Sequence, residues 1–400
     1  MFEIMEKNSQ EAVIKVIGVG GCGGNAVAHM IEKNVGGVEF ICANTDMQAL
    51  KKSQAKTVLQ IGEMMTRGLG AGAKPEIGRE AALEDRDAIA ELIDGADMLF
   101  ITAGMGGGTG TGAAPVIAQI AKEMGILTVA VVTKPFAFEG KRTKVASDGL
   151  DELSKYVDSL IVIPNEKLME VLGEDVPFLE AFRAANDVLH NAVSGIAEII
   201  NCAGMVNVDF ADVRTVMSEM GMAMMGSALA TGPERARIAA EQAVASPLLE
   251  DVNLANARGV LVNITTSSAF KMKEYYDVMN TIKAFTAEDA TVIVGNVFDE
   301  AMGDGLRVTM VATGLTGAQR RQQKPELRVM TQQVVRDGTT NQPIFVGGAT
   351  SGSMVGSSKA MEDEAPAVFG SNSRRAQVEA MKMSGVEEYD IPAFLRKQAD

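Results

Sequence analysis

The sequence predicts an α/β fold: a mostly parallel sheet with helices on both faces, a long central helix and a smaller second α+β domain. Three observations support this prediction. Continuous apolar runs alternate with helical patterns over the first two hundred residues, a helical pattern of two dozen residues follows, and strands around one helix come after it. Continuous rather than alternating apolar runs are typical of parallel strands buried on both faces.

Five apolar runs of the first half predict strands, at 13–20, 38–46, 98–106, 128–135 and 159–165. Helical patterns lie between them, for example at 76–96 and 114–125. Each run ends in Gly, Asn, Asp, Thr or Pro. Because ligands of doubly wound sheets bind at the carboxyl ends of the strands, we expect the functional residues there.

The second half begins with a helical pattern at 178–201, which would span about 36 Å at 1.5 Å per residue. Further helical stretches are expected near 210–225 and 233–246, with the methionine-rich run 217–225 as deformable core. Strands are then predicted at 259–266, 291–299 and 306–315, around a helix at 275–285. Residues after 315 are rich in Gln, Ser, Gly and Thr, which predicts a flexible, disordered linker. We divide the chain into 1–177, 178–203, 204–315, 316–388 and a terminal peptide, 389–400.

Composition excludes several classes of protein. The formal net charge of −15 argues against nucleic acid as a partner, since phosphates would repel it. No window approaches about 18 uninterrupted apolar residues, and the first ten residues are unlike a signal peptide, so we expect no membrane insertion. The three cysteines show no metal or redox spacing, and no His/Cys/carboxylate cluster suggests zinc. These features predict a cytoplasmic protein with reduced thiols.

The first strand is followed by a glycine-rich turn, residues 18–25, that opens a helix. Such a turn brings backbone N–H groups and a helix amino terminus close to phosphate. On this segment alone, the spacing Gly-x-Gly-x-x-Gly and an acid at Asp46 favour a dinucleotide-binding oxidoreductase. A tight turn without a ligand is the third interpretation that this segment alone leaves open.

A second glycine-rich turn, residues 104–112, follows the third strand. So many glycines cost conformational entropy on folding, which argues against a purely structural role. Successive N–H groups there would form an anion nest, with two Thr hydroxyls as further donors. Two phosphate cradles at one sheet edge favour a nucleoside triphosphate over a dinucleotide. No G-x-x-x-x-G-K-[ST] motif is present, so the chain is not a P-loop enzyme.

The motif GGGTGTG at 106–112 resembles the signature of the tubulin/FtsZ family. Other segments resemble the FtsZ branch in the same order: GAGA (70–73), TKPF (133–136), NVDFAD (207–212) and DIPAFLRKQAD (390–400). The resemblance covers all of the chain except the linker. It implies a GTPase that binds GTP or GDP with Mg²⁺, assembles with itself head to tail, and forms the division ring at midcell on the inner face of the membrane.

The resemblance also implies a role for individual residues. The first glycine turn and Gly107 to Thr111 would hold phosphates, while Phe182 would stack on guanine near Asn186. Without the resemblance, Phe182 is better explained by core packing on an amphipathic helix. The implied nucleotide-binding residues are Gly20, Gly21, Cys22, Gly23, Gly24, Asn25, Asn44, Asp46, Ala71, Gly72, Ala73, Gly104, Gly106, Gly107, Gly108, Thr109, Gly110, Thr111, Thr133, Pro135, Glu139, Arg142, Asn165, Phe182 and Asn186.

Three further residues, Asn207, Asp209 and Asp212, would form the catalytic loop that activates water. By themselves the two aspartates are better explained as a cap at a helix amino terminus. If guanine lies near Phe182, this loop is on the order of 35 Å away by helix rise. It would then serve the nucleotide of the next subunit, in a head-to-tail contact that does not close.

Two departures from the family pattern affect the expected site. Lys74 stands where the family has Asn or Asp, which puts the usual metal or water contact of that loop in doubt. The segment 139–143 is one residue shorter than the family's, and Arg142 is the substitute for its nucleotide-contacting Arg.

The terminal peptide 389–400 combines a capping Asp390 with Pro392 in a first helical turn. Ile391, Phe394 and Leu395 would form one apolar stripe. A docking helix or strand explains this stripe, with a frayed terminus as the alternative. The resemblance implies membrane tethers and regulators such as FtsA and ZipA as its partners.

Two rival functions remain at this point. One is an oxidoreductase of the dinucleotide-binding class. The other is a nucleotide-bound filament that does not hydrolyse, although the paired Asp209 and Asp212 argue against it.

Overall fold

The computed structural model describes residues 12–315, except for 174, 202–207, 220, 250–256 and 288–289, and all of these lie in one compact unit, Met1–Gln323. The predictions for Asn207, for the linker and for the terminal peptide fall outside the described residues. The proposed domain boundaries stay a prediction.

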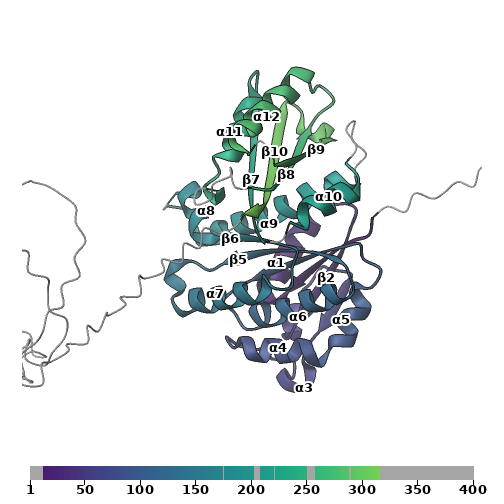
Figure 1. Ribbon diagram of the computed structural model, residues 1–400. Helices are drawn as coiled ribbons and strands as arrows, with labels where there is room; N and C mark the ends of the chain where they lie inside the picture. The colour runs from purple at the N-terminus through teal and green to yellow at the C-terminus, as the bar shows by residue number, and fades with distance from the viewer. Residues whose placement is uncertain are drawn as a thin grey trace, which may run out of the picture. The chain divides into compact units, whose positions relative to one another are not determined.

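The described strands form a single ten-stranded sheet in the order β3-β2-β1-β4-β5-β6-β7-β10-β8-β9 (Figure 1). Pairing is parallel throughout, except that β10 is antiparallel to both β7 and β8. The strands are β1 Ile14–Val19, β2 Val38–Asn44, β3 Thr57–Gln60, β4 Met98–Gly104, β5 Leu127–Lys134, β6 Ser159–Pro164, β7 Gly221–Thr231, β8 Gly259–Thr266, β9 Thr291–Phe298 and β10 Gly305–Leu315.

Helices cover both faces of this sheet, as predicted. The α-helices are α1 Gly20–Glu32, α2 Met47–Lys51, α3 Glu63–Thr66, α4 Pro75–Glu84, α5 Arg86–Ile93, α6 Thr109–Glu123, α7 Lys141–Leu153, α8 Asn165–Leu172, α9 Phe178–Asn201, α10 Phe210–Met217, α11 Arg235–Val244 and α12 Met272–Phe285. Short 3₁₀ helices lie at Ala137–Glu139, Pro247–Leu249 and Glu300–Met302. No helix in the described part is long and apolar enough to cross a membrane.

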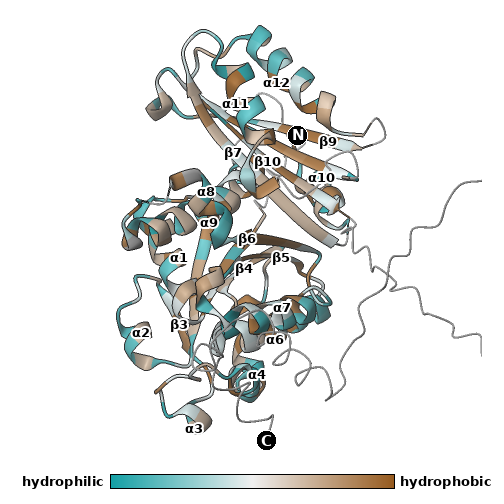
Figure 2. Ribbon diagram, turned by 90° about the vertical axis from the view of Figure 1, so that its left-hand side faces the viewer, coloured by the Kyte–Doolittle hydropathy of each residue, from teal (hydrophilic) through white to brown (hydrophobic). Residues whose placement is uncertain are grey.

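Three apolar cores hold these layers together. One joins the sheet to α1, α9 and α10, a second joins it to α4, α5, α6 and α7, and a third packs α11 and α12 against β8, β9 and β10. Figure 2 shows the brown apolar strands between helices whose teal sides face outward. Strands β4 and β5 are buried along nearly their whole length, which explains their continuous apolar sequence.

The long helix α9 has the predicted extent. It runs along the sheet from the carboxyl ends of the parallel strands to their amino ends. Leu189, Val193 and Ile196 are fully or almost fully buried at helical spacing and pack in the first core. At its far end the Asn201 side-chain amide donates to the Gly37 carbonyl at 2.7 Å, directly before β2. The carboxylate of Glu198 accepts from Asn263 at 3.0 Å, which ties α9 to β8 as well.

The helical prediction for 210–225 was wrong beyond Met217, where α10 ends. Gly221 has a φ of 148°, which favours glycine, and the chain continues as β7 between β6 and β10. The small residues and methionines of this segment are compatible with a helix or a strand, and pairing with strands on both sides makes it a strand. The helical pattern at 76–96 is likewise two helices, because Asp85 interrupts it and accepts the Gly62 N–H at 2.6 Å. The short strand β3 gave no apolar run to detect.

Because the buried stripe of α9 packs in the first core, removing one of its side chains should lower stability clearly. We expect Leu189→Ala to lower the free energy of unfolding by about 2–5 kcal/mol, through lost burial and a residual cavity. Arg183→Ala on the exposed side of the same helix is the matched control and should change it little. Urea denaturation followed by circular dichroism measures both, and equal effects of the two changes would contradict the expectation.

Candidate functional site

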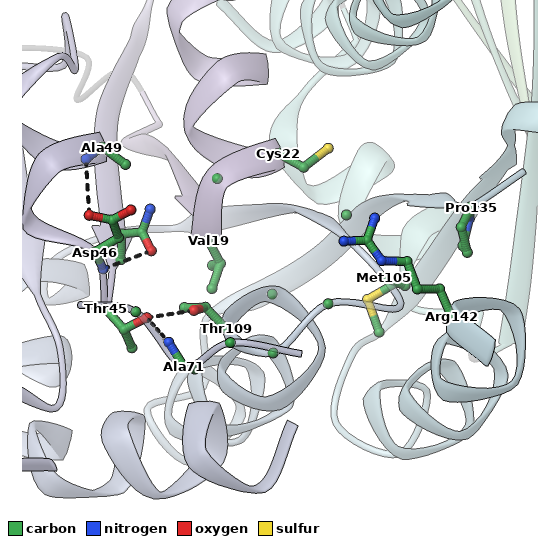
Figure 3. Close-up of a pocket in the computed structure, with 18 of the residues that line it drawn as sticks. Val19, Cys22, Thr45, Asp46, Ala49, Ala71, Met105, Thr109, Pro135 and Arg142 are labelled. Atoms are coloured by element: carbon green, nitrogen blue, oxygen red, sulfur yellow. Dashed lines mark hydrogen bonds between the residues drawn. The ribbon is translucent and has the colours of Figure 1, made fainter. Parts of the chain in front are cut away.

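A cavity of about 470 Å³ opens at the carboxyl ends of β1, β2, β4, β5 and β6 (Figure 3). This is the edge at which the sequence predicted the functional residues. Its lining residues are Val19, Gly21, Cys22, Asn44, Thr45, Asp46, Ala49, Leu69, Gly70, Ala71, Gly72, Gly104, Met105, Gly107, Gly108, Thr109, Gly110, Thr133, Pro135, Glu139, Arg142, Asn165 and Phe182.

The glycines of the first turn divide into two groups by their surroundings. A Cβ at Gly23 would lie 2.3 Å from the Thr102 carbonyl oxygen, so this glycine lets α1 pack directly on β4. Gly20 has a φ of 72°, a left-handed conformation that turns the chain into the helix. Beside Gly21 and Gly24, in contrast, there is open space. The exposed backbone of this turn is therefore available to a ligand.

The second turn is built in the same way. Gly106 has a φ of 98° and donates its N–H to the buried Thr111 hydroxyl at 2.8 Å, which holds the turn in shape. A Cβ at Gly108 would lie 2.2 Å from the Gly72 carbonyl oxygen, so the loop at 70–72 is in direct contact with the turn. Gly107 is open, and Thr109 begins α6 at the cavity wall. The N–H groups and positive dipole end of α6 favour an anion here.

Polar groups after β2 complete this wall. The Asp46 carboxylate caps α2 by accepting from the Gln48 N–H at 2.8 Å and from the Ala49 N–H at 3.4 Å, and Figure 3 draws the second of these bonds. The Asn44 side-chain oxygen accepts from the Asp46 N–H at 3.2 Å. The Thr45 hydroxyl lies between them, fully buried, and bonds to Thr109. The described residues contain no group of three His, Cys, Asp or Glu side chains that could hold a metal ion.

The opposite end of the cavity carries an aromatic ring and an unpaired polar atom. Phe182, near the start of α9, is 36% exposed and packs edge-to-face on Phe136, with 5.6 Å between ring centroids. The buried Asn165 side-chain oxygen has no hydrogen-bond partner among the described residues. The Glu139 carboxylate accepts from the Phe136 N–H at 3.0 Å and from Arg142 at 2.7 Å. A flat ring face and an unsatisfied amide oxygen together suit a planar heterocycle with N–H donors.

Not every predicted residue lines this cavity. Gly20, Gly24 and Asn25 line a neighbouring cavity of about 300 Å³ between α1 and α2, which shares Asn44 and Asp46 with the first. Five other predicted residues line neither cavity: Gly23, Ala73, Gly106, Thr111 and Asn186. Gly23, Gly106 and Thr111 shape the turns from behind.

The prediction also missed lining residues, which are Val19, Thr45, Ala49, Leu69, Gly70 and Met105. Thr45 lies between the predicted residues Asn44 and Asp46. Gly70 is the first residue of the motif GAGA, and Leu69 precedes it. Closeness in sequence to predicted residues could therefore have identified these three.

Asp209 and Asp212 lie away from the cavity, at the start of α10. Asp209 caps this helix, since its carboxylate accepts the Asp212 N–H at 2.8 Å, and both residues are exposed. The helix sits at the amino ends of the strands. Arg214 donates to the Gly125 carbonyl at 3.3 Å just before β5, and the Met217 carbonyl accepts at 2.8 Å from Ser159, the first residue of β6. The aspartates and the cavity therefore lie at opposite ends of the parallel strands.

Two glycine turns with open backbone, at the carboxyl ends of parallel strands, are typical of a nucleotide-binding protein. The model of the Tubulin/FtsZ family GTPase domain matches residues 13–173, and that of the FtsZ family C-terminal domain matches residues 221–316. The chain therefore belongs to the FtsZ family and carries its GTPase domain, which binds guanine nucleotide.

Individual relatives agree with this assignment. The chain is 57% identical to the cell division protein FtsZ of Pseudomonas aeruginosa over the full length of both, and 62% identical to that of Coxiella burnetii over 79% of this chain and 82% of the relative. Among solved structures, an empty FtsZ dimer from M. jannaschii is 43% identical and superposes with a TM-score of 0.73, covering 76% of this chain and 89% of the other.

Cys22 provides a chemical probe of the cavity, because its side chain is exposed there. Desolvation by the surrounding walls raises the pKa of its thiol; the Thr133 hydroxyl opposes this effect and the Glu139 charge adds to it. We expect slow maleimide labelling at pH 7 that accelerates roughly tenfold per pH unit as the thiolate forms. Saturating GDP should protect the thiol.

Mass spectrometry measures this labelling in a Cys202→Ser variant, which leaves Cys22 and Cys42 as the only cysteines. Cys42 is buried and serves as the internal control. Labelling at the same rate with and without GDP would mean that nucleotide does not occupy the cavity beside Cys22.

Proposed function

We propose that this chain hydrolyses GTP at a site shared by two copies joined head to tail, within filaments of a division ring at midcell. This proposal is carried by one observation: the cavity and the two aspartates of α10 lie at opposite ends of the parallel strands. The nucleotide cavity lies at the carboxyl ends of the parallel strands and the aspartates of α10 at their amino ends. A second copy stacked in the same orientation would bring its Asp209 and Asp212 to the first copy's cavity.

Each wall of the cavity is assigned one part of the nucleotide. Open backbone at Gly21 and Gly107 and the start of α6 would hold the phosphates. The exposed ring of Phe182 would stack on guanine, whose N–H groups match the unpaired Asn165 oxygen. Glu139 would accept from the ribose hydroxyls. Asn25 and Asn186 remain proposed contacts to the guanine edge, from outside the main cavity.

Magnesium fits this site as a companion of the nucleotide. Since no cluster of protein ligands is present in the described part, the phosphates would supply most of its oxygens, with Asn44 and Asp46 the nearest side-chain candidates. Bound in this way, the ion would supply positive charge that offsets the charge developing on the phosphates during transfer.

The aspartates would act on water. Asp209 is engaged as a helix cap, whereas the exposed Asp212 carboxylate forms no hydrogen bond or ion pair within the described residues. Asp212 is therefore the better candidate to orient and deprotonate the attacking water on the neighbouring copy's terminal phosphate. Phosphoryl transfer needs mainly such positioning, so assembly itself would complete the catalytic site.

The shared site predicts that GTP turnover per molecule rises steeply with protein concentration and then levels off, because isolated copies are incomplete. A phosphate-release assay across a dilution series measures this. Constant specific activity down to concentrations without filaments would contradict the shared site, and absence of any phosphate release would favour a filament that does not hydrolyse.

Asp212→Ala provides the residue-level control for this series. It should bind GTP as the unchanged protein does and lose turnover by roughly a hundredfold, as expected for loss of a general base. Mixed with the unchanged protein it should lower the activity of its neighbours. A collapse of GTP affinity instead would place the aspartate in its own subunit's pocket.

A separate prediction concerns the shortened loop after Glu139. Arg142 lines the cavity and pairs with Glu139, whereas the adjacent Lys141 does neither. We expect Arg142→Ala to weaken GTP binding by roughly tenfold, the scale of one charge-assisted hydrogen bond, and Lys141→Ala to have little effect. Competition binding with a fluorescent GTP analogue measures both, and equal small effects would remove Arg142 from the site.

The terminal peptide 389–400 is proposed to dock on membrane tethers and regulators such as FtsA and ZipA. Its apolar stripe is the support for this proposal, and a long linker would let one filament engage many tethers. Deleting 389–400 should leave GTP turnover nearly intact and abolish recruitment to a tether-coated bilayer. Undiminished recruitment in a sedimentation assay would move the docking site elsewhere.

A further inference from the structure

The only two histidines of the chain meet between α1 and α9. His29 lies in the last turn of α1 and His190 on α9, and their rings pack edge-to-face with 6.3 Å between centroids. Because a carboxylate oxygen can only accept, His29 Nε2 donates to Asp187 of α9, at 2.8 Å. An ordinary histidine is the one side chain that changes its charge between pH 5 and 8. The fold therefore gathers both of these groups at a single contact between two helices.

This contact lies one helical turn beyond the two asparagines proposed to hold the guanine edge. His29 follows Asn25 on α1, and His190 follows Asn186 on α9, each at the i, i+4 spacing of neighbours on one helix face. Neither histidine lines the nucleotide cavity or the cavity beside it. The distance between α1 and α9 at the histidines therefore also sets the distance between the two asparagines.

The two histidines differ in the charges around them. A proton on His29 has a counter-ion in the Asp187 carboxylate. The half-buried His190 ring forms no ion pair within the described residues, and its Nδ1 lies 3.1 Å from the neutral side chain of Asn191. The groups whose charges act on His190 are all positive or able to become so: His29 and Lys33 of α1, and Arg307 of β10.

The nearby carboxylates are already engaged with other cations. Asp187 accepts from His29 and lies 3.7 Å from the Lys33 amine. Glu198, farther along α9, lies 3.5 Å from Arg307. A proton on His190 would therefore add a positive charge that no described carboxylate is free to balance.

These surroundings favour the neutral ring. Burial lowers the pKa of His190 below its ordinary value of 6.5, the hydrogen bond to Asn191 opposes this effect, and the charges of Arg307, His29 and Lys33 add to it. A proton therefore binds His190 more weakly when α9 is packed on α1 than when the ring is in water. By linkage, the packed arrangement is fully stabilised above about pH 6.5, and this stabilisation is lost as the pH falls through the lowered pKa.

We propose that His29 and His190 form an acid-sensitive contact that sets, through the packing of α9 on α1, how tightly this chain holds guanine nucleotide. The placement of guanine rests on the proposed function; the dependence on pH is new. A proton on His190 drives α9 away from α1, so that water can reach the charge. Phe182 and Asn186 move with α9, and the base loses contacts. Both histidines are positioning residues, since they act on the nucleotide through the two helices.

The first test is competition binding of GTP to the full-length protein between pH 7.5 and 5.5, using a fluorescent GTP analogue. The phosphates of GTP titrate in the same range, so the readout is the affinity of the unchanged protein relative to His190→Gln at each pH. His190→Gln keeps a polar side chain and removes the titration. We expect the unchanged protein to lose roughly tenfold in relative affinity over this range, the scale of one protonation.

A pair of lysine variants tests the role of charge. Lys33→Gln removes one cation that acts on His190, so its loss of affinity in acid should be smaller. Lys56→Gln, at an exposed position directly before β3, removes the same charge elsewhere and should behave like the unchanged protein. Equal losses in the two lysine variants would overturn the proposal, as would the same pH profile in His190→Gln and the unchanged protein.

The second test needs no variant, so it stands even if His190→Gln fails to fold. Coupling is reciprocal: if a proton on His190 weakens nucleotide binding, bound nucleotide must weaken proton binding by the same factor. NMR of the histidine rings, of which the chain has two, follows both titrations without nucleotide and with saturating GDP. One ring should titrate at lower pH with GDP, and two curves that GDP leaves unchanged would overturn the proposal.

A separate arm tests the placement of guanine on which the proposal rests. Asn186→Ala should weaken GTP binding at pH 7.5, where the contact between the histidines is intact. Unchanged affinity in this variant would remove guanine from this end of the cavity and so contradict the proposed function, whatever the pH profiles show.

Discussion

Parallel pairing of β1 to β6 and the length of α9 together fix where the cavity and the start of α10 lie. Parallel pairing places the carboxyl ends of β1, β2, β4, β5 and β6 along one edge, where the cavity opens. Helix α9 places Phe182 at the carboxyl ends of these strands, and its Asn201 is hydrogen-bonded to Gly37 near their amino ends. Its buried stripe of Leu189, Val193 and Ile196 locks it against the strands.

The walls of the cavity depend on close backbone contact. Glycines at 23 and 108 have no room for a Cβ, while those at 21 and 107 face open space. The first pair lets helix, strand and loop approach each other, and the second pair leaves the backbone bare for a ligand. A run of glycines thus serves two physical purposes at once, which a motif alone does not separate.

Much of the fold follows from local pattern. Five of the six described strands that precede α9, and the whole of α9, lie where apolar runs and helical spacing predicted them. β7 could not be predicted in this way, because its identity as a strand depends on pairing with β6 and β10, far away in the sequence. Most of the predicted nucleotide-binding residues line the cavity, but Thr45 was missed, since its importance comes from a buried hydroxyl that meets Thr109 across 64 residues.

The cavity and the start of α10 lie at opposite ends of the parallel strands, which has a consequence for any row of copies joined cavity to α10. Such a row would have polarity: at one end a cavity would remain open, and at the other end the exposed carboxylates at the start of α10 would face no cavity. Nucleotide in the open cavity could leave and be replaced, whereas nucleotide between two copies would be enclosed. Growth, exchange and inhibition at the two ends would therefore obey different chemistry, although every copy in the row is identical.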